Sequence, residues 1–232
     1  MIDLQSAIIL FVVFLYSTVC HEAAHAWVAH RLGDDTAYRG GQVSLDPIPH
    51  IKRAPLGMLV LPLIMLATSG TIIGWGLAPY DRDWARRFPM KDAWVAVAGP
   101  LANLALVLIA AIAIRIGLAQ GVFETPQALR MTSFAVAAAG SGAVVQALAM
   151  TLGVIFGLNL LLLVFNLLPL PPLDGSKIPL FFLRGSTANR YQETIENPSL
   201  ALIAMLVAIN GFGPIFNVVA VWGFKLLYAG RF

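Results

Sequence analysis

Long apolar segments separated by short polar ones dominate the pattern of the chain. A helix of about 20 apolar residues can cross a hydrocarbon core of about 30 Å, and five segments with few charges reach that length. The spacing predicts an all-α, polytopic membrane protein with about five to six transmembrane helices. The five segments are Ser6–Val28, Pro55–Trp75, Ala93–Leu118, Phe134–Leu173 and Leu200–Leu227.

Composition strengthens this prediction. Hydrophobic residues make up 59% of the chain and charged residues only 12%, whereas soluble domains carry about 25% charged residues. The net charge of +3 is spread over short loops that also contain acids, which indicates contact with lipid headgroups and no nucleic-acid surface. We expect a single membrane-embedded domain over residues 1–232, with its core at 4–185 and C-terminal helices at 198–229.

Three of the apolar segments allow two interpretations each. Pro55–Trp75 contains Pro62 and ends in a glycine-rich turn, so it is either a crossing or a re-entrant segment. Phe134–Leu173 is longer than one untilted crossing and forms one bent helix or two. Leu200–Leu227 is interrupted by glycines and Pro214, and forms one crossing or a broken pair.

The first helix and the loop after it have clearer boundaries. The helix is predicted from Leu4 to Arg31, because Gly33 supplies a stop signal. Residues Tyr38–Leu45 contain β-tolerant side chains around two glycines, which predicts a short strand or hairpin near the chemistry described next. Its residues 42–44 are predicted to hold an extended peptide by edge pairing.

The motif His21-Glu22-Ala23-Ala24-His25 lies in that first helix. Histidines four residues apart share one helix face and can bind one metal ion, while Glu22 lies beside them as a general base. Imidazole ligands with one open position suit a hydrolytic zinc site. The alternative is a helix end whose polar residues are merely solvated among headgroups.

A catalytic zinc needs a third protein ligand, and Asp174 is the candidate. It directly follows an apolar run and three prolines, which stiffen the chain in an extended form. The alternative is an ordinary turn with a surface aspartate. A glutamate ligand is disfavoured, because Glu124, Glu193 and Glu196 do not lie in a second apolar helix.

Three motifs in this order resemble the site-2 protease family in its compact form, which lacks an inserted peptide-binding domain. They are His21–His25, Gly99-Pro100-Leu101-Ala102-Asn103 opening another helix, and Asn166–Gly175 ending a third. The turn Gly74–Pro79 follows the family pattern only in part, since a lysine is missing.

The resemblance implies one Zn²⁺ per chain, held by His21, His25 and Asp174, with Glu22 as the catalytic base. It places Asn103 and Asn166 near the site, where we expect them to bind substrate backbone or the developing oxyanion.

Shared ligands also constrain topology. If Asp174 joins His21 and His25, the C-terminal ends of the first helix and of the Asn166 helix lie on one membrane side. That arrangement requires either a re-entrant Pro55–Trp75 or two crossings in Phe134–Leu173, and the resemblance favours the re-entrant segment.

These observations predict an intramembrane zinc endopeptidase that hydrolyses peptide bonds in or near transmembrane segments of membrane-protein substrates. The alternative is a membrane transporter or assembly factor with a metal or proton relay. We expect a bacterial inner-membrane protein whose site opens toward the cytoplasm, because the basic stretch 81–92 follows the positive-inside rule.

Overall fold

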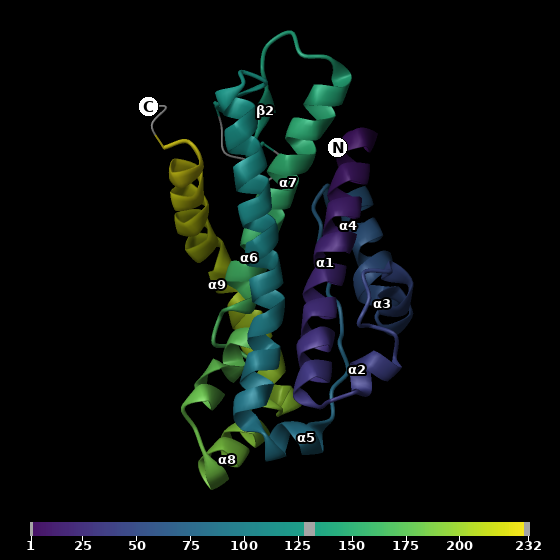
Figure 1. Ribbon diagram of the computed structural model, residues 1–232, viewed down its shortest axis with the longest axis vertical. Coiled ribbons are helices and arrows are strands. Elements are labelled where there is room, and N and C mark those ends of the chain that lie inside the picture. The colour runs from purple at the N-terminus through teal and green to yellow at the C-terminus, as the bar shows by residue number, and fades with distance from the viewer. Residues whose placement is uncertain (1, 128–132, 230–232) are drawn as a thin grey trace.

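The fold is a bundle of long helices, seen in a computed structural model that describes residues 2–127 and 133–229 (Figure 1). Four helices within these ranges are long and apolar enough to cross a membrane, or five spans if a bent pair is counted as one. This confirms the polytopic membrane class, at the lower end of the predicted number. The four are α1 (Leu4–Leu32), α6 (Pro89–Ala119), α7 (Ala143–Asn166) and α9 (Pro198–Leu227).

The long helices alternate in direction. In Figure 1, α1 and α7 begin at the top, whereas α6 and α9 begin at the bottom. The helix α6 packs most extensively, against α7 and α1. The helix α9 packs mainly on α7, and most of its surface is exposed, as expected for a helix that faces lipid. The C-terminal ends of α1 and α7 therefore lie on one side, as predicted.

Both ends of α1 are set by local sequence. The carboxylate of Asp3 accepts a hydrogen bond from the Ser6 amide at 2.9 Å, which caps the first turn. Gly33 ends the helix in a left-handed conformation with φ of 104°. Glycine adopts this conformation without steric strain because it has no Cβ. These bounds match the predicted ones within one residue.

The segment after α1 enters the bundle and returns. It contains α3 (Pro47–Arg53), a π-helical turn at Leu56–Val60, and α4 (Leu61–Ser69), and it bends by 110° between α3 and the part that follows. Gly70 then lies against Ile2, at the start of α1. The chain runs back without helix or strand to Asp81, whose amide donates to the Asp34 carboxylate at 2.9 Å.

The chain over Pro55–Trp75 turns back on itself, which favours the re-entrant alternative. Eleven residues after Gly70 cover nearly the length of the 29-residue helix α1, and about 3.3–3.6 Å per residue is the limit for a chain. The segment is therefore close to fully extended. Its Trp75 amide donates to the Gly57 carbonyl at 3.1 Å, so the start and end of Pro55–Trp75 lie at the same depth.

The other two ambiguous segments each contain one helix. In Phe134–Leu173 only α7 crosses, because the residues before it form a hairpin and those after it form a proline-rich arm. The C-terminal helices expected at 198–229 are one helix, α9, which is continuous through Pro214, so the single crossing holds and the broken pair does not. In hydrocarbon an interrupted helix leaves backbone groups without partners, which favours continuity over the local preference of glycine and proline.

The predicted strand at Tyr38–Leu45 is also wrong. The Thr36 amide and hydroxyl both donate to the Asp34 carboxylate, which starts the short helix α2 (Thr36–Arg39) in place of a strand. The two-stranded sheet of the described residues pairs β1 (Phe123–Glu124) with β2 (Val136–Ala137). It lies at the opposite end of the bundle (Figure 1).

Three short elements close the lower end in Figure 1: α5 (Arg82–Arg87), a 3-10 helix, η2 (Asp174–Phe181), and the amphipathic α8 (Gly185–Ile195). Lys177 of η2 pairs with Asp92 of α6, with 2.8 Å between Nζ and Oδ1. The buried apolar side chains Ala93, Leu180 and Ala188 join α6, η2 and α8. The residue Asp174 thus lies on an arm fixed to α6.

Candidate metal centre

His21 and His25 lie on the inner face of α1, and both are buried. They are separated by one helical turn, so both imidazoles point the same way, as the motif predicts. His21 is eleven residues before the end of α1, which at 1.5 Å per residue is about 16 Å along the helix axis. The imidazoles therefore lie within the bundle, and not at the end of the helix.

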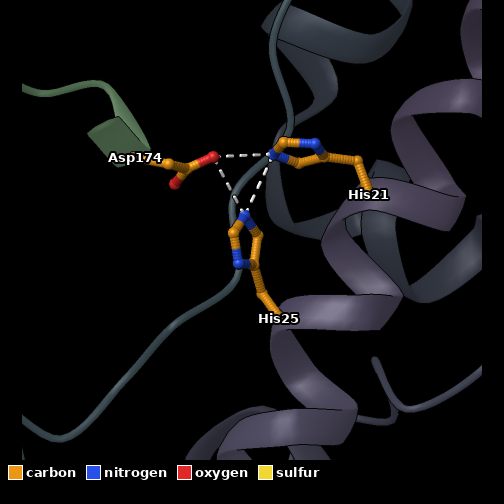
Figure 2. Close-up of side chains that lie close together, drawn as sticks. All are labelled: His21, His25 and Asp174. Atoms are coloured by element: carbon orange, nitrogen blue, oxygen red, sulfur yellow. Dashed lines mark hydrogen bonds and ion pairs between the residues drawn. The ribbon is translucent and has the colours of Figure 1, made fainter. Parts of the chain in front are cut away.

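Asp174 reaches these histidines because the arm after α7, residues 167–174, folds back against the end of that helix. The arm packs tightly there, since a Cβ on Gly175 would lie 2.5 Å from the Leu168 carbonyl oxygen. The carboxylate Oδ2 lies 3.2 Å from His21 Nε2 and 3.4 Å from His25 Nε2, and Figure 2 shows the three side chains converging.

The spacing of these three atoms fits a metal ion. The two Nε2 atoms are 3.0 Å apart, and within the described residues these three side chains form the one group with metal-ligand spacing. Ligands about 2.0–2.1 Å from a tetrahedral zinc ion stand about 3.3 Å apart. The donor set of two imidazoles and one carboxylate also leaves one position open.

The charges at the site call for a cation. His25 Nδ1 lies 2.7 Å from the Val95 carbonyl, which can only accept, so Nδ1 carries a proton. In a neutral imidazole Nε2 then has a lone pair facing Asp174 Oδ2, a buried oxygen without a hydrogen-bond donor in the described part of the chain. Such an orphan acceptor is costly unless a positive charge lies between the groups.

Gly99 of α6 supplies the room for the two imidazoles. A Cβ there would lie 2.6 Å from His21 Nε2 and closer still to His25 Nε2. Gly99 and Pro100 were expected to open a helix, but they lie inside α6. Pro100 has no N–H to bond a carbonyl in the preceding turn, and the apolar surroundings keep the helix continuous.

Glu22 lies beside the histidines and under the returning segment. It is buried, and its carboxylate makes no hydrogen bond within the described residues. A Cβ on Gly76 would lie 2.6 Å from Glu22 Oε1. The extended chain therefore passes directly over this carboxylate, and only a glycine fits there.

The structure gives the two predicted asparagines other contacts. Asn103 is fully buried behind His21, with its Oδ1 2.7 Å from His21 Nδ1, on the opposite side of the ring from Nε2. Asn166 donates to the Leu162 carbonyl of its own helix at 3.0 Å. Neither contact points the asparagine side chain toward the open metal position where a substrate would bind.

The remaining histidines stay apart from the cluster. His30 Nδ1 lies 2.7 Å from Asp35 Oδ1, outside the cluster. His50 is buried, with Nε2 3.0 Å from the Ser44 carbonyl. Sequence reasoning missed Asn159 of α7, whose Oδ1 accepts from Asn103 Nδ2 at 2.9 Å. Its signal was an amide within an otherwise apolar crossing.

Comparison with known proteins agrees with this geometry. The model of peptidase family M50 matches residues 9–210. YwhC of Bacillus subtilis (strain 168), described as a candidate zinc metalloprotease, is 34% identical over 170 residues, which are 73% of this chain and 66% of YwhC.

A second relative has a similar description. Rip2 of Mycobacterium tuberculosis (strain ATCC 25618 / H37Rv), also described as a candidate zinc metalloprotease, is 29% identical over 213 residues, 92% of this chain and 71% of Rip2. The chain thus spans about two thirds of the length of these relatives. No solved structure gives a significant match.

Proposed function

Because the chain belongs to peptidase family M50, the site-2 protease family it resembles in sequence, we propose that it is an intramembrane zinc endopeptidase. The observation that carries this proposal is the convergence of two imidazoles and one carboxylate, beside a buried glutamate, inside a bundle of helices long enough to cross a membrane. We assign His21, His25 and Asp174 as the zinc ligands and Glu22 as the general base.

Zinc in such a site polarises a carbonyl group and lowers the pKa of a water molecule to about 7. The residues of this chain provide the rest. Val95 and Asn103 fix the two imidazoles through their Nδ1 atoms, and Glu22 accepts the proton of the attacking water and passes it to the leaving amine. No hydrogen bond from the described residues occupies the Glu22 carboxylate, which leaves it available for this proton.

The substrates we propose are transmembrane segments of other proteins. A helical substrate hides its peptide bonds in internal hydrogen bonds, so it has to unwind before attack. The extended segment 71–79 suits an unwound strand better than the loop at 42–44, because it passes over Glu22. Within the described residues it makes one hydrogen bond to other backbone, Trp75 to Gly57, besides the Leu77 carbonyl that accepts from Gln42 Nε2.

Charge supports an orientation with the site open to the cytoplasm of a bacterial inner membrane. Lysine and arginine concentrate in the segments at the lower end of Figure 1, where α1 and α7 end and α6 and α9 begin. These residues are Arg31, Arg39, Arg82, Arg86, Arg87, Lys91, Lys177, Arg184 and Arg190.

The test is cleavage by purified protein in liposomes that contain a single-span substrate, with metal content measured in the same samples. Wild type is expected to bind zinc and to cleave. Glu22→Gln is expected to retain zinc and to lose cleavage by at least about 100-fold, because a positioned general base contributes about 10²–10⁴-fold.

Two further variants complete the test. His25→Ala is expected to lose zinc and cleavage, while His30→Ala is the matched control, since its imidazole is on the same helix but outside the cluster. Glu193→Gln, at an exposed glutamate of α8, controls for the change at Glu22. Ion transport by wild type without any cleavage would refute the protease and favour a transporter.

A further inference from the structure

A chain of buried polar side chains runs from His21 into the centre of the bundle. Asn103 Nδ2 donates to Asn159 Oδ1 at 2.9 Å, and Asn159 Nδ2 lies 2.9 Å from Ser17 Oγ and 2.8 Å from the Ile155 carbonyl. Both asparagines have no exposed surface. The chain joins α6, α7 and α1 at one point, in a part of the bundle that is otherwise apolar.

The Ile155 carbonyl fixes the direction of every hydrogen bond in this chain. A carbonyl only accepts, so the amide nitrogen of Asn159 has to face it. The oxygen of Asn159 then faces Asn103 and accepts a hydrogen bond from its amide nitrogen. The remaining Asn103 atom, Oδ1, is an acceptor toward His21 Nδ1, and therefore His21 carries its proton on Nδ1.

This direction decides what His21 offers to the metal centre. With a proton on Nδ1, a neutral His21 has its lone pair on Nε2, the atom 3.2 Å from Asp174 Oδ2. If the Asn103 amide were reversed, its N–H would face Nδ1 and the ring proton would move to Nε2, where it would compete with a metal ion. Asn103 alone cannot prevent that reversal, because either end of an amide can face His21.

We infer that Asn159 is a positioning residue of the metal centre, which holds the Asn103 amide in one orientation and thereby sets the tautomer of His21. This inference rests on the proposed zinc site. It assigns Asn159 an indirect role, because Asn159 contacts Asn103 and Asn103 contacts the ligand His21. Ser17 contributes less to the orientation of the Asn159 amide, because the Ile155 carbonyl fixes that orientation by itself.

The experiment compares Asn159→Ala with Asn159→Asp. Alanine removes the acceptor for Asn103, so zinc affinity, measured by competition with a chelator, is expected to fall about 10–100-fold, as is typical for partners of metal ligands. Aspartate keeps an oxygen that accepts from Asn103, so its affinity is expected to stay closer to that of wild type. Asn210→Ala is the matched control, since Asn210 also donates to a carbonyl one turn back, on exposed α9.

A second readout separates positioning from folding. Nitrogen-15 NMR of histidine-labelled, metal-free protein is expected to show the Nδ1–H tautomer for His21 in wild type and Asn159→Asp, and a mixture in Asn159→Ala. A cobalt-substituted absorption spectrum that changes in Asn159→Ala but not in Asn210→Ala would support the same conclusion.

The outcomes are distinct. Zinc affinity within twofold of wild type in Asn159→Ala, or an equal loss in both Asn159 variants, would overturn the inference while the protease proposal stands. Should Asn159→Ala not fold, a folded Asn159→Asp with affinity more than tenfold lower would overturn it as well. A wild-type chain that binds no zinc would instead remove the proposed function, and the inference with it.

Discussion

Replacing Gly99 with alanine tests the metal centre from the helix that contributes no ligand. The new Cβ would lie 2.6 Å from His21 Nε2 and closer to His25 Nε2. Non-bonded heavy atoms prefer about 3.5–4.0 Å, so the overlap is about 1 Å. Because α1 and α6 pack closely along this face, either the helices separate or both imidazoles turn away.

Both responses have a measurable magnitude. Overpacking of this kind costs about 1–3 kcal/mol of stability, and a displacement of about 1 Å at a catalytic group costs about 100-fold in rate. We therefore expect Gly99→Ala to unfold at a lower temperature, to lose zinc on dialysis, and to cleave a single-span substrate at about 1% of the wild-type rate or less.

The assay combines thermal unfolding in detergent, zinc content and cleavage in liposomes. Gly213→Ala is the control, because a Cβ there meets nothing within 4 Å and alanine favours a helix over glycine by about 1 kcal/mol. A Gly99→Ala protein that keeps its zinc and cleaves within twofold of wild type would refute the close approach of α6 to the histidines.

Two further substitutions test the returning segment and the arm. Gly76→Ala places a Cβ 2.6 Å from Glu22 Oε1, so cleavage should fall about 100-fold with zinc content unchanged. The control is Gly142→Ala, whose Cβ meets nothing within 4 Å and which should keep full activity. Loss of zinc in Gly76→Ala would contradict the prediction that segment 71–79 contacts Glu22 and not the zinc ligands. Lys177→Met leaves the buried Asp92 carboxylate without its cation, which should cost about 3 kcal/mol in stability. The double variant with Asp92→Asn should recover most of the thermal midpoint, and an unchanged midpoint in Lys177→Met alone would show that the pair does not hold the arm.

The histidine pair could be predicted from sequence because a helix repeats almost every four residues, so spacing alone places His21 and His25 on one face. Asp174 could be proposed from its position after stiff prolines. Its contact with α1, however, depends on the direction of α7 relative to α1, which the pattern of apolar and polar residues does not determine. Spacing predicts contacts within one helix, whereas contacts between helices need the topology.

Glycine and proline favour breaks in water, and that preference left a broken pair open at Leu200–Leu227, whereas the helix start at Gly99–Pro100 was part of the family resemblance. In an apolar bundle each broken turn would expose backbone groups without partners, so α6 and α9 continue through these residues. At Tyr38–Leu45 the opposite happened, because the Asp34 side chain stabilised a helical turn where residue type favoured a strand.

The non-helical backbone at the site has a consequence for how water reaches it. Backbone that is neither helix nor closed sheet is tolerated at membrane depth only when protein covers it or when it borders water. Two such segments meet the active side chains: 71–79 passes over Glu22, and the arm after Asn166 brings Asp174 to the histidines. Segment 71–79 leads from the site to Asp81 at the lower end, and the arm after Asn166 starts at that same end, where the basic residues gather. Because hydrolysis of a peptide bond inside a bilayer requires water, we expect water to reach the proposed zinc ligands and the proposed base from this end, along the non-helical backbone.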